Sequence, residues 1–209
     1  MNTPELFQIS PVVPVVVLEN AKDAVLLAEA LLEGGIGIME VTLRSDAALA
    51  SIEAIAKAVP EMNVGAGTVI NADDLLRVRD AGGQFSFSPG ISPELLGTSA
   101  KECIPFIPGV ATASEVMAAV NAGIGACKLF PATAVGGVSL LKGFAGPFPD
   151  MRFCPTGGIG LDNMNGFLAL PNVDCVGGSW IVPKDAIAAG DFEKITALCR
   201  SALAKAAEV

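Results

Sequence analysis

The sequence alternates between short β-branched runs and longer stretches rich in Ala, Leu and Glu along its whole length. The short runs have the length and composition of buried strands, and the stretches between them carry apolar residues at helical spacing. Strands separated by helices pair in parallel through right-handed crossovers. Eight strands are expected, at residues 12–17, 36–42, 63–67, 84–88, 104–107, 126–130, 152–155 and 173–177. Eight such units predict an α/β fold of the (β/α)8 TIM-barrel type.

An open, doubly wound sheet is the alternative architecture. The strand count and the absence of a GxGxxG motif after the first strand disfavour it. No linker, low-complexity tract or charge run interrupts the chain, so residues 1–209 are expected to form a single domain. In a barrel of this kind the active site lies at the C-terminal ends of the strands, which directs attention to the residues there.

Two absent residue types restrict the possible chemistry. The 209 residues include no histidine and no tyrosine. A histidine-based metal centre and a Ser-His-Asp triad are therefore impossible. Any general base must be Asp, Glu, Lys, Cys, a chain terminus or water.

Charge, hydropathy and cysteine spacing indicate which partners and which cellular compartment to expect. The net charge is −9 and no Lys/Arg cluster is visible, so nucleic-acid binding is not expected. The apolar run at 12–18 is too short for a membrane span, and no secretory signal precedes it. The five cysteines show no CxxC spacing, which favours reduced thiols in a cytoplasmic protein.

Lys128 lies in the middle of an expected buried strand, between Cys127 and Leu129. Burial of a charged ammonium is costly, so such a lysine pairs with an acid or loses its proton. A neutral lysine attacks carbonyl carbon, which makes Schiff-base chemistry the first hypothesis. The structural alternative is a lysine at a strand end whose amine reaches water.

Glu40 occupies an equivalent position in the expected strand at 36–42, between Met39 and Val41. Alternation of side chains along each strand points Glu40 and Lys128 into the barrel if their apolar neighbours pack on the helices. A central barrel brings distant strands together, so the two groups could pair and act as base and nucleophile. The alternative is a structural ion pair in the barrel interior.

Two glycine-rich turns follow the last two expected strands, at 155–160 and 176–180. Glycine lets backbone N–H groups approach an anion, and the loops after strands seven and eight often hold phosphate in barrels. Tight turns alone also explain a Gly-Gly pair. Earlier along the chain, Arg44 and Thr68 follow the second and third strands, where they could hold a carboxylate. The alternative for Arg44 is an ordinary surface position. Pro89 follows the fourth expected strand, and there the alternative to a binding role is a plain turn.

With these residues in place, the chain resembles the family of 2-keto-3-deoxy-6-phosphogluconate (KDPG) and 4-hydroxy-2-oxoglutarate (KHG) aldolases. The matching segments run from the first expected strand to the eighth: PVVPVVVLE, MEVTLRS, VGAGTVIN, FSPGI, IPGVAT, KLFPA, FCPTGGI and GGSWIVP. The resemblance implies a metal-independent class I aldolase of the Entner–Doudoroff pathway, a cytoplasmic homotrimer. It implies cleavage of KDPG to pyruvate and glyceraldehyde 3-phosphate, and of KHG to pyruvate and glyoxylate.

The resemblance also assigns roles to individual residues. Lys128 matches the Schiff-base lysine and Glu40 matches the general acid/base. Arg44 and Thr68 match groups that hold the pyruvate carboxylate. Phe130 and Pro89 match walls of the pocket, and Thr156 matches a group near the substrate hydroxyls. Gly157, Gly158 and Ser179 match the phosphate site.

Two departures from the family pattern accompany the match. Thr133 stands where many relatives have Glu, and Leu129 replaces an aromatic residue after the lysine. Leu129 is expected to face the helices, whereas Thr133 could affect solvent access or specificity. Two rival readings remain at this point: an aldolase for the 6-phosphogalactonate epimer, and a phosphosugar-binding barrel without catalysis.

Overall fold

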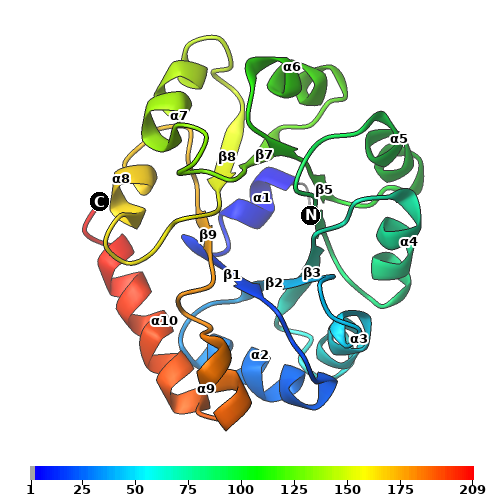
Figure 1. Cartoon of the computed structure of the whole chain (residues 1–209), viewed down its shortest axis with the longest axis vertical. Coiled ribbons are helices and arrows are strands. Elements are labelled where there is room, and N and C mark those ends of the chain that lie inside the picture. The colour runs from blue at the N-terminus through cyan, green and yellow to red at the C-terminus, as the bar shows by residue number, and fades with distance from the viewer. Residues whose placement is uncertain (1–2) are drawn as a thin grey trace.

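The computed structural model describes residues 3–209. It has a core of parallel β-strands surrounded by helices (Figure 1). The strands are β1 (Val12–Val16), β2 (Ile38–Thr42), β3 (Asn63–Gly67), β4 (Ser86–Phe87), β5 (Phe106–Ile107), β6 (Gly109–Val110), β7 (Ala126–Leu129), β8 (Arg152–Pro155) and β9 (Val176–Gly178). All the strand pairings between them are parallel, as expected for strands joined by helices.

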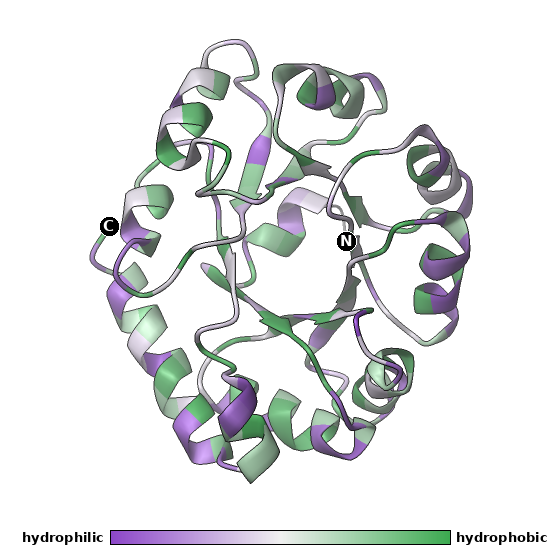
Figure 2. Cartoon of the chain, viewed as in Figure 1, coloured by the Kyte–Doolittle hydropathy of each residue, from purple (hydrophilic) through white to green (hydrophobic). Residues whose placement is uncertain are grey.

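The helices lie around the outside of the strands, with one exception (Figure 1). They are α1 (Thr3–Phe7), the 3-10 helix η1 (Ala21–Asp23), α2 (Ala24–Glu33), α3 (Ala48–Ala58), α4 (Ala72–Asp80), α5 (Pro93–Glu102), α6 (Ala113–Asn121), α7 (Gly137–Ala145), α8 (Met164–Leu168), α9 (Lys184–Ala189) and α10 (Phe192–Ala206). Figure 2 shows apolar residues along the strands and hydrophilic residues gathered on the helices around them.

The expected eight strands of one barrel are observed, within residues 3–209, as two sheets. Six strands follow the order β5-β4-β3-β2-β1-β9, and three follow the order β6-β7-β8. The expected fifth strand divides at Pro108, which has no N–H to donate to a ladder. Residues before this proline pair with β4, and the Pro108 carbonyl accepts from the Lys128 amide at 2.9 Å. Isolated bridges join Phe153 to Val173 and Thr156 to Gly177. They connect β8 and the residue after it with β9 and the residues just before it.

Helix α1 is the exception: it lies within the ring of strands in Figure 1. Its Leu6 and Phe7 are buried, and the Phe7 ring stacks on Phe87 with 6.2 Å between centroids. Pro4 lies close to Gly125, just before β7, so α1 covers the N-terminal ends of the strands. The opposite, C-terminal ends are therefore the open side. Five residues are too few for helical periodicity, so neither α1 nor the six-residue α9 was expected.

Helix starts follow from local sequence. Asn71 accepts from the Asp74 amide at 2.8 Å, and Ser92, followed by a proline, accepts from the Leu95 amide at 3.1 Å. Thr112 and Glu115 form a capping box at α6. The strand expected at 173–177 is observed as Val176–Gly178. The strands expected at 63–67 and 152–155 have the bounds predicted.

None of the described helices is both long and apolar enough to cross a membrane. The five cysteines are all free thiols, of which Cys103 is exposed and the others are buried.

Candidate active site

Lys128 and Glu40 form an ion pair in the interior of the molecule. The Lys128 Nζ lies 3.0 Å from Glu40 Oε1 and 3.2 Å from Oε2. The two residues are 5% and 2% exposed, so water screens the pair little. The sequence predicted that these groups could meet, and the structure brings them together although they are 88 positions apart along the chain.

Neighbouring strands set the position of each partner. On β7, Lys128 is aligned with Gly109 on one side and with Cys154 on the other. On β2, Glu40 is aligned with Gly65, and the carboxylate lies over Gly67, where a Cβ atom would overlap Glu40 Oε1. The absence of a side chain at Gly67 therefore provides the space that the Glu40 carboxylate occupies. The sequence placed Gly67 only at the end of the expected strand at 63–67, and this role was missed.

We expect Gly67→Ala to disturb the pair without unfolding the chain. The new methyl group must displace the Glu40 carboxylate, because real Cβ atoms do not approach so closely. A displacement of this kind is expected to lower kcat by at least about 10²-fold, the cost of misplacing a reacting group by an ångström. Steady-state kinetics with a circular-dichroism melt will check this. Gly97→Ala on α5, where a Cβ meets nothing within 4 Å, is the control. Unchanged kcat in Gly67→Ala would contradict the expectation.

Two aromatic rings border the lysine amine. The Nζ lies 5.1 Å from the Phe87 ring centroid and 5.4 Å from the Phe130 centroid. Ring faces attract a cation and exclude water, so they form an apolar boundary around a polar pair. Phe130 was expected as a wall of the pocket, whereas Phe87 was missed. The signal for Phe87 was its position in the run FSFSPG, where alternate residues share a face.

Arg44 and Thr68 follow aligned positions at the C-terminal ends of β2 and β3. Thr42 is aligned with Gly67, and the next amide, Leu43, donates to the Gly67 carbonyl at 2.8 Å. Arg44 is exposed and, within residues 3–209, has no ion-pair partner. Its charge is thus available to an anion on the open side.

Thr68 has a backbone φ of 62°. The left-handed region is costly for a β-branched residue and persists only where its surroundings impose it, often at functional sites. Pro89 is exposed and, with Ser88 and Ile70, borders a small hollow of about 200 Å³. Its backbone packs where a Cβ on Gly109 would lie. The structure therefore places Pro89 at the rim rather than beside the Lys128 amine.

The turn after β8 brings the remaining expected residues to the same end of the sheet. Thr156 is buried and its hydroxyl packs against Gly177, which a bridge aligns with it. Gly157 and Gly158 have φ angles of 104° and 75°, which glycine adopts without strain. Ser179, two residues beyond Gly177, is exposed. The two glycine-rich turns, which the sequence predicted after the last two strands, therefore lie side by side.

Three of the buried cysteines are poor competitors of Lys128 as nucleophiles. Burial raises the pKa of Cys127 and of Cys199 to about 12, and burial also raises the pKa of Cys175 well above its usual value. A thiol reacts as the thiolate, which such pKa values disfavour at neutral pH. Within residues 3–209, no three His, Cys, Asp or Glu side chains gather as a metal cluster would require.

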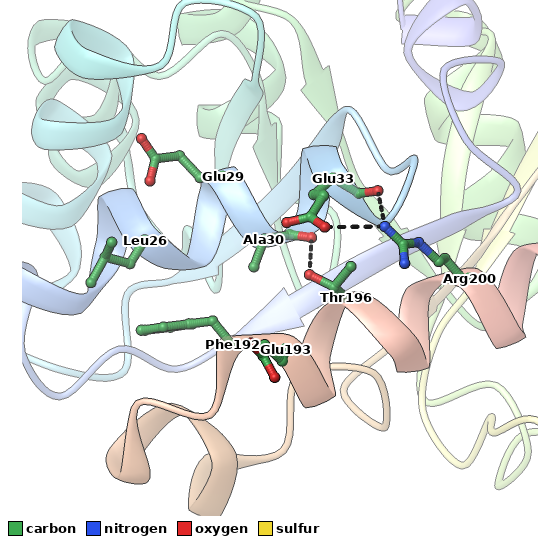
Figure 3. Close-up of a pocket in the computed structure, with 8 residues that line it drawn as sticks. All are labelled: Leu26, Glu29, Ala30, Glu33, Phe192, Glu193, Thr196 and Arg200. Carbon is green, nitrogen blue, oxygen red and sulfur yellow. Dashed lines mark hydrogen bonds and ion pairs between the residues drawn. The ribbon is translucent and has the colours of Figure 1, made fainter.

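A larger hollow lies away from this pair, between α2 and α10 (Figure 3). Its volume is about 470 Å³, and its lining includes the carboxylates of Glu29, Glu33 and Glu193. Arg200 pairs with Glu33 at 3.1 Å, so its charge is already neutralised (Figure 3). This acidic surface does not suit an anionic ligand, and its hydrogen bonds hold the two helices together.

Comparisons with known proteins agree with this arrangement. The family model described as KDPG and KHG aldolase matches residues 4–198. A 2-dehydro-3-deoxy-phosphogluconate aldolase of Pseudoalteromonas atlantica is 49% identical over 209 residues, covering 100% of this chain and 97% of the relative. The KHG/KDPG aldolase of Escherichia coli is 51% identical over 193 residues, covering 92% of this chain and 91% of the relative.

A solved structure is also similar to this chain, over almost the whole length of both. It is the KDPG aldolase of Legionella pneumophila, described with pyruvate captured at low pH as a covalent carbinolamine intermediate. The TM-score is 0.95 at 46% identity, with 97% of this chain and 98% of that chain covered. From the sequence motifs, the buried lysine–glutamate pair and these matches together, the chain belongs to the KDPG and KHG aldolase family.

Proposed function

We propose that this chain is a class I aldolase that cleaves KDPG to pyruvate and glyceraldehyde 3-phosphate. The observation that carries the proposal is the Lys128 amine held 3.0 Å from the Glu40 carboxylate, in an interior site below the open end of the strands. A carboxylate in hydrogen-bond contact can take the ammonium proton and free the amine for attack. The names of the relatives at 49% and 51% identity support the same reaction.

The first half of the reaction forms a covalent bond to Lys128. Glu40 takes a proton from the ammonium, and the amine attacks the C2 ketone of the substrate to give a carbinolamine. The proton on Glu40 then goes to the carbinolamine hydroxyl, which leaves as water. The product is an iminium cation on Lys128, beside a carboxylate that is ionised again. The carbinolamine in the Legionella pneumophila relative supports this order.

The second half uses the iminium as an electron sink. Glu40, directly or through one water, removes the proton of the C4 hydroxyl, and the C3–C4 bond breaks toward the iminium. Glyceraldehyde 3-phosphate leaves, and the enamine stays on Lys128. Glu40 returns its proton to the enamine carbon, and water then releases pyruvate and regenerates the amine. One carboxylate thus serves as base and acid in turn.

The groups around the pair fit the two ends of such a substrate. Arg44 and the Thr68 hydroxyl would hold the carboxylate, because a free guanidinium and a hydroxyl lie at adjacent strand ends. Thr156 lies near the substrate hydroxyls, and Phe130 and Pro89 bound the space. The phosphate would meet the two glycine-rich turns, at Gly157, Gly158 and Ser179.

Further features of the proposal depend on the resemblance to the family. We propose that the reaction needs no metal or cofactor, because the imine itself stabilises the developing charge. A single domain over 1–209, a homotrimer and a cytoplasmic location complete the proposal. A closed barrel belongs to it too: the two observed sheets join where the chain passes through Pro108 and at the bridges between β8 and the β9 segment.

Borohydride trapping tests the proposal directly. The chain is incubated with pyruvate, reduced with borohydride and digested, and the modified peptide is identified by mass spectrometry. We expect one N-carboxyethyl lysine, at Lys128. A label at another lysine, or none, would remove the mechanistic basis of the proposal.

Substrate assays separate this proposal from its rivals. Pyruvate release from KDPG, from its 6-phosphogalactonate epimer and from KHG is followed with lactate dehydrogenase, with and without EDTA. We expect kcat/KM to be highest for KDPG, measurable for KHG and unchanged by EDTA. Preference for the epimer would reassign the substrate. Ligand-dependent stabilisation without pyruvate release would indicate a binding protein.

A further inference from the structure

Thr133 contacts the first glycine of the proposed phosphate turn with both of its hydrogen-bond donors. Its backbone amide donates to the Gly157 carbonyl at 3.1 Å, and its hydroxyl donates to the same oxygen at 3.2 Å. The hydroxyl also packs on the second glycine, since a Cβ on Gly158 would overlap Thr133 Oγ1. The Thr133 side chain is exposed, so burial in the core does not explain its position.

The neighbouring carbonyls of the turn are held in the same way. The Ala132 amide donates to the Thr156 carbonyl at 2.8 Å, before the glycines. After them, the Asn163 side-chain amide donates to the Gly158 carbonyl at 3.0 Å, and its oxygen accepts from the Gly160 amide at 3.0 Å. Three successive peptide groups therefore have their carbonyl oxygens bound.

A trans peptide group points its C=O and the following N–H in opposite directions. Holding the Gly157 carbonyl on Thr133 thus aims the Gly158 N–H away from Thr133. By the same geometry the amides of Gly157 and Ile159 point away from their own anchors. The Gly157 N–H faces Gly177 in the bridge between Thr156 and Gly177. Within residues 3–209, the N–H groups of Gly158 and Ile159 donate to no other protein group. Successive free amides in a turn form an anion-binding concavity, which is what a phosphate group requires.

We propose that Thr133 is a positioning residue that raises the preference of this enzyme for phosphorylated over unphosphorylated substrates. The inference rests on the proposed aldolase function and deepens it. The Thr133 hydroxyl fixes the Gly157–Gly158 peptide plane and with it the Gly158 N–H that meets the phosphate. Thr133 is also uncharged, so it does not oppose the phosphate as a carboxylate at this position would. A substrate that has no phosphate gains nothing from this arrangement.

The test compares Thr133→Val, which removes the hydroxyl and keeps the shape, with Thr133→Ser, which restores it. We expect Thr133→Val to raise KM for KDPG by about 3- to 10-fold, the effect of one neutral hydrogen bond, with kcat nearly unchanged. The Ki of inorganic phosphate as a competitive inhibitor should rise by a similar factor. Thr133→Ser should recover most of both, and kcat/KM for KHG should stay within about 2-fold throughout.

Thr98→Val on α5 is the matched control, because Thr98 lies away from the strand ends and its hydroxyl makes no hydrogen bond among the described residues. Amide NMR provides a readout that does not depend on turnover: inorganic phosphate should shift the Gly158 and Ile159 signals, more weakly in Thr133→Val. Equal losses with KDPG and KHG, or no loss with either, would overturn the inference. A wild-type chain inactive on both substrates would instead refute the proposed function.

Discussion

Lys128→Ala is expected to abolish aldol cleavage, to the limit of detection, and to prevent borohydride trapping of pyruvate. The variant has no amine at the only position where a buried lysine meets a carboxylate in the described chain. Without the iminium, the electrons of the C3–C4 bond have no acceptor, so the loss should be larger than for any other substitution. Steady-state pyruvate release and mass spectrometry of the reduced protein provide the measurements.

A loss of folding must be distinguished from a loss of chemistry. Lys128→Ala leaves the Glu40 carboxylate buried without its partner, which costs on the order of 3–5 kcal/mol in other proteins. Lys128→Met combined with Glu40→Gln removes both charges and should therefore fold better while staying inactive. Lys142→Ala, at an exposed position on α7, is the control and should keep wild-type turnover. Wild-type activity in a folded Lys128→Ala protein would refute the assigned role.

Glu40→Gln is expected to lower kcat by about 10²- to 10⁴-fold while the imine with pyruvate still forms, more slowly. The amide can still accept a hydrogen bond from Lys128 Nζ, but it cannot take the C4 hydroxyl proton or return it to the enamine. Imine formation and the later proton transfers are thus separated, and the variant should show strong borohydride labelling while being nearly inactive. Exchange of the pyruvate methyl protons with deuterated water should slow in parallel, because it reports enamine protonation.

The matched control for this variant is Glu29→Gln, an exposed carboxylate in the hollow between α2 and α10 (Figure 3). It should change neither kcat nor labelling. If folded Glu40→Gln forms no imine at all, Glu40 acts before the C–C cleavage, in freeing the amine. If Glu40→Gln keeps kcat within about 2-fold of the wild type, a different group moves the proton, and the pair is structural.

The chemistry was predictable because charged groups in apolar strands are unusual. Lys128 and Glu40 each lie between apolar residues, and alternation along a strand assigns them to one face without any knowledge of the fold. The glycine-rich turns were recognised from their place after the last two strands. The same reasoning placed Arg44 and Thr68 at strand ends, where the structure has them, although it did not foresee the left-handed backbone of Thr68.

Other features needed the tertiary structure, because their cause lies in residues far away in the chain. Gly67 resembles any turn glycine until the Glu40 carboxylate is seen above it. Phe87 becomes part of the site only because α1 and β7 bring Phe7 and Lys128 to its ring. Strand division at Pro108 depends on which neighbour each half pairs with.

The amino-acid sequence by itself indicated the alternation of strands and helices, excluded histidine chemistry and singled out Lys128 and Glu40 as the candidate nucleophile and acid. These depend on residue type and local periodicity, which a linear pattern carries. Tertiary structure alone decided that the amine and carboxylate meet at 3.0 Å, and that Thr133 holds the turn at Gly157. Such distances arise from packing between strands distant in sequence, and no local pattern encodes a distance across the interior.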